Sequence, residues 1–291
     1  MAIPAIQDSI VAGVDGSPSS AAAVEWAARN AALRDRPLVL VHVVPSPMVT
    51  TAPWPQLPLP DDAFRVMQEE GERLLAQARA AAEQAGAGEV RTAVLQAGIV
   101  GTLTELSRDA DRIVVGSRGQ TALGRMLLGS VSTGLVHQAE CPVVIVRDGD
   151  QPPGDAPVLV GIDGSPASEL ATEVAFEEAS VRQVELVALH GWRDTSLFHY
   201  PGLDTESLQT QAEAVLAERL AGWQERYPDV TVRRVVVAEH PARALVQRAE
   251  EAQLVVVGSR GRGGLTGKLL GSVSTGVVHS VRVPVMVARP R

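Results

Sequence analysis

Two glycine-rich segments of nearly the same sequence contain the residue types that bind phosphate. The first, GSRGQTALGRMLLGSVSTG, covers 116–134, and the second, GSRGRGGLTGKLLGSVSTG, covers 258–276. Thirteen of the nineteen aligned positions are identical, and both segments fit the spacing G-x2-G-x9-G-S. Glycine lets a backbone approach a ligand closely, and a helix that begins at the last Gly-Ser pair offers unpaired N–H groups and partial positive charge. The pattern predicts phosphate binding, with the Ser130 and Ser132 hydroxyls as additional donors.

Two other phosphate motifs are excluded by single positions. A Walker A loop needs Ser or Thr after its lysine, but Lys268 is followed by Leu269, and Arg262 stands where the upstream glycine belongs. The dinucleotide pattern G-x-G-x-x-G fails because Thr266 replaces its third glycine. The repeated G-x2-G-x9-G-S spacing is therefore the pattern to explain.

Composition limits the classes of partner. The chain has 291 residues, 45% of them hydrophobic, and a formal net charge of −8, which argues against nucleic acid or an anionic membrane as the main partner. The single cysteine, Cys141, cannot form an intrachain disulfide and suits a reducing compartment. No apolar run approaches the roughly 18 residues of a membrane span, and no signal peptide is evident. The sequence predicts a cytoplasmic protein without a membrane span.

The duplication extends over the whole chain. Residues 10–44 align with 158–192 at an offset of 148, whereas the glycine segments align at an offset of 142. The missing residues fall most simply in the proline-rich segment 45–62. The polar, Pro/Gly-rich seam RDGDQPPGDAP reads as a linker. We expect one domain over 1–147, a linker over 148–156 and a second domain over 157–291.

Each copy alternates apolar strand patterns with helical patterns. Short runs of β-branched residues separated by helices are typical of a parallel sheet covered on both faces. The prediction is two tandem doubly wound α/β domains, each a mostly parallel five-stranded, Rossmann-like sheet with helices on both faces. In the first copy we expect strands over 9–15, 38–44, 90–96, 112–116 and 142–147, and helices over 18–33, 62–85, 100–110 and 130–139.

The glycine motif resembles the ATP-binding motif of the universal stress protein family. In both copies it follows an apolar fourth strand and precedes a helix that leads into CPVVIV or VPVMVA, and the turns GVDGS and GIDGS belong to the same resemblance. The resemblance covers nearly all of both halves and is nearest to tandem-domain members from actinobacteria. It implies one ATP site per domain, with any Mg²⁺ held by phosphates and water and no dedicated metal site.

The resemblance also implies roles for particular residues. Asp15 and Asp163 would contact the ribose, or Mg²⁺ through water, although either could instead cap the following helix. Val43 and Gly191 correspond to the adenine contact at the end of the second strand, and the Arg and Ser residues of the motif would hold phosphates. The full set is Gly13, Asp15, Val43, Val115, Gly116, Arg118, Gly119, Gly129, Ser130, Val131 and Ser132 in the first domain, and Gly161, Asp163, Gly191, Val257, Gly258, Arg260, Gly261, Gly271, Ser272, Val273 and Ser274 in the second.

The implied function is regulation in a stress or growth-state response through nucleotide-dependent binding of an unidentified protein partner. No base is evident to activate water, so at most slow ATP hydrolysis is expected. An adenylating enzyme is the alternative, although such enzymes usually carry an SGG-type loop where this chain has GVDGS. A nucleotide-free scaffold, and cyclic AMP as the ligand, also stay open. The last strands, 142–147 and 284–288, are expected to pair domains, and a homodimer of chains is a further hypothesis.

Three other features carry weaker expectations. His42 and His190 occupy equivalent positions without metal-ligand spacing around them and are expected to be structural. Trp54, within a proline-rich loop, would suit a lid or a partner contact. The loops between the motif glycines differ, with Arg125 in the first and Lys268 in the second, so the two sites are not expected to bind equally well.

Overall fold

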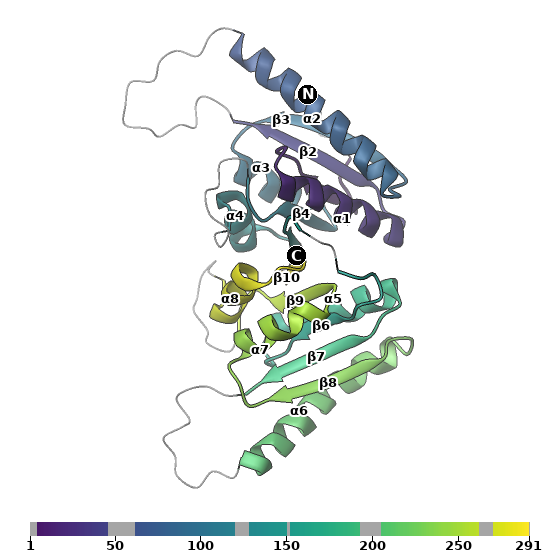
Figure 1. The fold of residues 1–291 in the computed structure, drawn as a ribbon, viewed down its shortest axis with the longest axis vertical. Coiled ribbons are helices and arrows are strands. Elements are labelled where there is room, and N and C mark those ends of the chain that lie inside the picture. Colours follow the sequence, from purple (N-terminus) through teal and green to yellow (C-terminus); the bar gives the residue numbers. More distant parts are fainter. Residues whose placement is uncertain are drawn as a thin grey trace, which may run out of the picture. The chain divides into compact units, whose positions relative to one another are not determined.

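The structure, a computed structural model, describes residues 5–45, 62–119, 128–149, 152–192, 205–261 and 270–290 (Figure 1). The chain forms two compact units, Met1–Asp148 and Gly149–Pro290. The division between them falls inside the Pro/Gly-rich seam of the sequence.

The first unit is a five-stranded parallel sheet with a helix between successive strands. Its strand order is β3-β2-β1-β4-β5, and all neighbouring strands are parallel. Helix α1 contacts α2, and α3 contacts α4, which gives one helical layer on each face (Figure 1). The elements are β1 (Ile10–Gly13), α1 (Pro18–Arg34), β2 (Leu38–Val44), α2 (Ala63–Gln84), β3 (Val90–Gln96), α3 (Ile99–Leu106), β4 (Arg112–Gly116), α4 (Ser130–Gln138) and β5 (Val143–Val146).

The second unit repeats this topology with strand order β8-β7-β6-β9-β10, again all parallel. The doubly wound α/β prediction is therefore confirmed. The elements are β6 (Val158–Gly161), α5 (Pro166–Arg182), β7 (Leu186–Gly191), α6 (Thr205–Arg226), β8 (Val232–Val237), α7 (Pro241–Arg248), the 3₁₀ turn η3 (Ala249–Glu251), β9 (Leu254–Gly258), α8 (Ser272–Ser280) and β10 (Val285–Ala288).

In both units the strand order reverses beside the first strand. In the first unit Ile10 of β1 pairs with Leu38 of β2 on one side and with Arg112 of β4 on the other. Chains leaving β1 and β4 then go to opposite faces, which opens a crevice at the carboxyl ends of these strands. The turn after β1 and the glycine-rich segment after β4 both start at this edge.

Local sequence explains where the first helix of each unit begins and ends. The Ser17 hydroxyl accepts the backbone N–H of Ser20, and Pro18 occupies the first helical position, where its missing N–H costs nothing. The second unit repeats the cap with Ser165. One helix differs from the prediction, because α3 ends at Leu106 and not near residue 110. There the amide of Arg108 bonds to Glu105 three residues back, which tightens the chain out of the α-helix.

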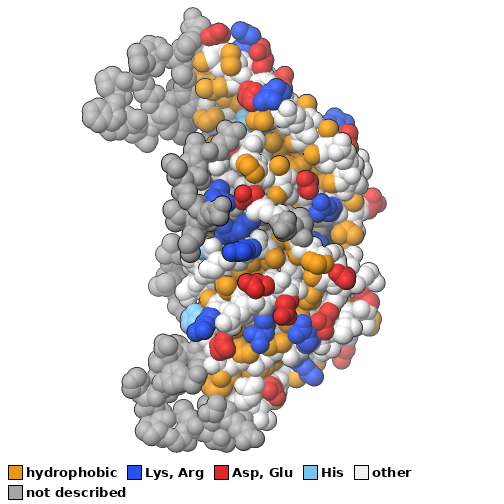
Figure 2. Space-filling view, viewed as in Figure 1, with side chains coloured by type: hydrophobic (Ala, Val, Ile, Leu, Met, Phe, Trp, Pro, Cys, Tyr) orange, Lys and Arg blue, Asp and Glu red, His pale blue; other side chains and the backbone are white. Residues whose placement is uncertain are grey.

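The strands form the core, and most charged side chains lie outside it, Arg112 and Glu178 being buried. Strand β5 is buried at every residue, as is β10. On the face drawn in Figure 2, acidic and basic side chains are interspersed, in keeping with exposed ion pairs such as Arg65–Glu69 and Arg79–Glu83 on α2. Of the helices that the structure describes, none combines the length and hydropathy needed to cross a bilayer.

Candidate functional site

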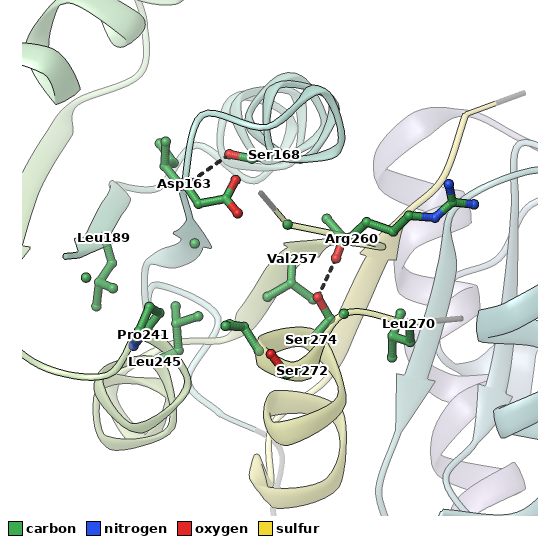
Figure 3. Close-up of a pocket in the computed structure, with 17 residues that line it drawn as sticks. Asp163, Ser168, Leu189, Pro241, Leu245, Val257, Arg260, Leu270, Ser272 and Ser274 are labelled. Atoms are coloured by element: carbon green, nitrogen blue, oxygen red, sulfur yellow. Dashed lines mark hydrogen bonds between the residues drawn. The ribbon is translucent and has the colours of Figure 1, made fainter. Parts of the chain in front are cut away.

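A cavity of about 300 Å³ lies at the carboxyl edge of the second unit. All eleven residues predicted for this unit line it. Leu189, Pro241 and Leu245 form an apolar side, while the start of α8 and Asp163 supply polar groups (Figure 3). Six lining residues were missed by the sequence reasoning, namely Ile162, Ser168, Leu189, Pro241, Leu245 and Leu270. Pro241 and Leu245 could have been expected, because the segment after the third strand also reaches the carboxyl edge.

Asp163 is held against the glycine-rich segment by the turn after β6. One carboxylate oxygen, Oδ1, accepts the N–H of Ser165 at 2.9 Å, and the Asp163 N–H donates to Ser168 Oγ at 3.0 Å. The other oxygen, Oδ2, would lie 2.7 Å from a Cβ at position 261. The aspartate therefore makes a contact within the turn and also borders the cavity, whereas the residue that caps α5 is Ser165. Only glycine at 261 leaves the carboxylate this position.

The N-terminus of α8 provides the donors of the cavity. The first backbone bond of this helix runs from the Thr275 N–H to the Gly271 carbonyl at 2.8 Å. The N–H groups of Ser272, Val273 and Ser274 therefore have no carbonyl acceptor within the helix. The helix dipole adds partial positive charge at the same place. Ser274 is buried, and its hydroxyl donates to the Gly258 carbonyl (Figure 3). In this structure that hydroxyl faces the backbone and does not point into the cavity as an additional donor.

The first unit holds the same contacts. Asp15 Oδ1 accepts the Ser17 N–H at 2.9 Å, and Oδ2 would lie 2.9 Å from a Cβ at position 119. Thr133 donates to Gly129 at 2.9 Å, so α4 starts with the same set of amides, which belong to Ser130, Val131 and Ser132. The Ser132 hydroxyl donates to the Gly116 carbonyl at 2.7 Å, as its counterpart does. Of the remaining predicted residues, Val43 and Val115 are buried, and a Cβ at Gly13 would contact Val115.

The three glycines of the motif are required for different reasons. A Cβ at Gly116 would lie 2.7 Å from the Ser19 carbonyl carbon and 2.8 Å from the Ser20 nitrogen, so this glycine lets β4 approach the first turn of α1. Gly119 faces the Asp15 carboxylate instead, and a Cβ at Gly129 would lie 3.3 Å from the Arg118 Cα. Of the three glycines, Gly119 is the one whose added Cβ would meet a charged group, the Asp15 carboxylate.

The motif arginines differ from the prediction in where their charge lies. Arg118 donates to Asp148 Oδ1 at 2.8 Å, so its guanidinium is engaged by a carboxylate. The Arg260 side chain extends away from Asp163 in Figure 3, although the residue lines the cavity.

Other candidates have local structural partners. A ring nitrogen of His42 lies 2.7 Å from the Val14 carbonyl, and that of His190 lies 2.7 Å from the Ile162 carbonyl. Cys141 is buried, with its thiol directed at the Pro142 carbonyl. Within the described ranges, no group of three or more His, Cys, Asp or Glu residues could hold a metal ion. Trp54, Arg125 and Lys268 lie outside the described residues.

Comparisons with known proteins agree with this arrangement. The model of the universal stress protein family matches residues 8–147 and again 156–289. Universal stress protein Rv2005c of Mycobacterium tuberculosis is 53% identical over 99% of both chains, and universal stress protein Rv2623 of the same organism is 54% identical over 96% of both. A crystal structure of a universal stress protein from Archaeoglobus fulgidus shares the fold, with a TM-score of 0.70 at 24% identity, covering 97% of this chain and 98% of that one. The chain belongs to the universal stress protein family and carries two of its domains in tandem.

Proposed function

We propose that the protein binds ATP at one site in each unit and acts as a nucleotide-dependent regulator. The observation that carries the proposal is the cavity of the second unit, where an apolar side, an aspartate and a helix N-terminus face one space. Its volume of about 300 Å³ lies at the lower end of the range for small-molecule sites.

The parts of this cavity suit the parts of an adenine nucleotide. Leu189, Pro241 and Leu245 offer apolar surface to a base. The Asp163 carboxylate would accept hydrogen bonds from ribose hydroxyls, or bind water on a Mg²⁺ ion carried by the phosphates. The amides at the start of α8 would bind phosphate oxygens, because such N–H groups lack acceptors and carry partial positive charge.

Regulation agrees better with this site than rapid catalysis does. Hydrolysis requires a base that orients water at the terminal phosphate. Among the described lining residues Asp163 is the only carboxylate, and one of its oxygens already accepts the Ser165 N–H. A bound triphosphate would instead change the charge at the carboxyl edge of each sheet, and a protein partner would respond to that change.

The proposal is tested by counting bound nucleotide. Freshly purified protein is denatured, and released nucleotide is quantified by chromatography for the wild type, Gly119→Ala, Gly261→Ala and the double variant. The wild type is expected to release one ATP for each unit, each single variant to lose one, and the double variant to lose both. Gly101→Ala, at a position with no atom within 4 Å of an added Cβ, is the matched control.

Other outcomes separate the competing functions. Release of cyclic AMP, or its tighter binding in competition with ATP, would replace ATP as the ligand. Pyrophosphate release with an acyl substrate would favour an adenylating enzyme. If no nucleotide is released and none binds on addition, the proposal is wrong and the chain is a scaffold. The homodimer stays a prediction, and gel filtration at the monomer mass of 30.7 kDa would contradict it.

A further inference from the structure

The two units differ by one charge beside the motif arginine. In the first unit, Asp148 follows β5 and pairs with Arg118. The offset of 142 that relates the two glycine segments places the uncharged Pro290 at the corresponding position after β10. No carboxylate is therefore available at that position to pair with Arg260.

The ion pair lies at the glycine-rich segment itself. Arg118, Gly119 and Asp148 line one hollow of about 320 Å³ together with the start of α1. The Arg118 side chain is only 20% exposed and that of Asp148 is 44% exposed, so the pair is partly shielded from water. Neighbouring Arg147 lies within the same charge cluster, since burial and then the positive charge of Arg118 lower its pKa, while Asp148 opposes that change.

The backbone of Arg118 is fixed while its side chain has a competing partner. The Arg118 carbonyl accepts the Ser17 hydroxyl at 3.1 Å and the Ser19 hydroxyl at 2.6 Å. In the second unit Ala167 replaces Ser19, and the Arg260 carbonyl accepts Ser165 at 3.4 Å. Because the backbone is held, a ligand at this segment competes with Asp148 for the charge of the Arg118 guanidinium.

We infer that Asp148 determines the phosphate specificity of the first site. It occupies the Arg118 guanidinium and adds a negative charge at the hollow, so it weakens nucleotide binding at the first site by an amount that grows with the number of phosphates. The second site has Pro290 at the equivalent position, and among the described residues Arg260 forms no ion pair with a carboxylate. This inference rests on the proposed nucleotide function. A partly exposed ion pair of this kind corresponds to roughly a two- to fivefold effect on affinity.

The test measures each site separately by calorimetry on nucleotide-free full-length protein. The Gly261→Ala background reports the first site, and the Gly119→Ala background reports the second. Adding Asp148→Asn to the first background is expected to raise ATP affinity about two- to fivefold and ADP affinity less, while adenosine affinity stays unchanged. Pro290→Asp in the second background is expected to lower ATP affinity and leave adenosine unchanged. Both effects should shrink at high salt.

Adenosine is the control for a structural effect, because a general change in the fold would alter its affinity too. Equal ATP affinity with and without Asp148→Asn, or an equal gain for adenosine and ATP, would overturn the inference while leaving the nucleotide sites in place. If neither background binds any nucleotide and the wild type also fails, the proposed function is wrong and the inference is wrong with it.

Discussion

Replacing Gly116 by alanine is expected to destabilise the first unit even though the added methyl group faces no ligand. The new Cβ would lie 2.7 Å from the Ser19 carbonyl carbon and 2.8 Å from the Ser20 nitrogen. These are backbone atoms at the start of α1, so no flexible side chain can move aside. The helix start must shift by several tenths of an ångström, which disturbs the Ser19 hydroxyl bond to the Arg118 carbonyl.

The expected loss is about 1 to 3 kcal/mol of unfolding free energy, the usual cost of inserting a methyl group into a well-packed site. A two-unit chain need not unfold in one transition, so global denaturation alone is a poor measure. Hydrogen exchange followed by mass spectrometry on peptides from α1 and β4 reports the local change. Gly258→Ala is the matched variant in the second unit, with its Cβ 2.6 Å from the Ala167 carbonyl oxygen, and is expected to reduce protection in α5 and β9.

Gly101→Ala is the control, since its Cβ would meet nothing within 4 Å and alanine favours helix by about 0.5 to 1 kcal/mol. If Gly116→Ala leaves the protection of α1 at the wild-type level, this glycine is not needed for close packing. The separation of structural from ligand-facing glycines would then be wrong.

Three further substitutions follow from single contacts. Phe176→Ala should cost about 3 to 5 kcal/mol in the hydrogen exchange of α5 and α6 peptides, because the ring is fully buried and stacks on Trp223 and Tyr227; a loss below 1 kcal/mol would contradict that packing. Ser19→Ala should cost about 1 kcal/mol through its lost bond to the Arg118 carbonyl, and unchanged hydrogen exchange in α1 would count against that bond. Arg73→Ala should raise the pKa of Glu70, because the Arg73 hydrogen bond holds that pKa below its ordinary value. The pair therefore stabilises the fold at pH values above the ordinary pKa of the carboxyl, and this stabilisation is lost as the pH falls through the lowered pKa. An NMR titration showing no change in the Glu70 pKa would refute it.

Much of the fold could be predicted because its signals are local. Runs such as LVLVHVV form strands wherever a parallel sheet buries both faces, and the structure has β2 at Leu38–Val44. The Ser17-Pro18 pair marks a helix start for reasons contained in four residues. The end of α3 was predicted too far along, near residue 110 and not at Leu106, because no glycine or proline terminates the pattern there and the chain tightens gradually instead.

The site could be predicted only in part, because sequence spacing fixes which edge of the sheet a residue reaches but not where its side chain turns. Asp163 and Gly261 were predicted to share a site from motif and topology, and their close approach agrees with that. The ion pair of Arg118 with Asp148 joins residues thirty positions apart, so no local pattern predicts it. Likewise the Ser132 hydroxyl finds a backbone acceptor on β4, which competes with the ligand role that spacing alone suggested.

Because the three glycines serve different purposes, the presence of the whole motif does not by itself establish nucleotide binding. Gly116 and Gly258 would be kept by helix packing alone, and Gly129 and Gly271 by their approach to the backbone after β4 and β9. Two thirds of the motif's glycines could therefore persist in a protein that binds no nucleotide. Gly119 and Gly261 are different, since each meets only an aspartate carboxylate oxygen, which a methyl group could displace at little cost to the fold. Nucleotide binding is for this reason better tested at the second glycine than at the first or third, where a loss of binding and a loss of structure would coincide.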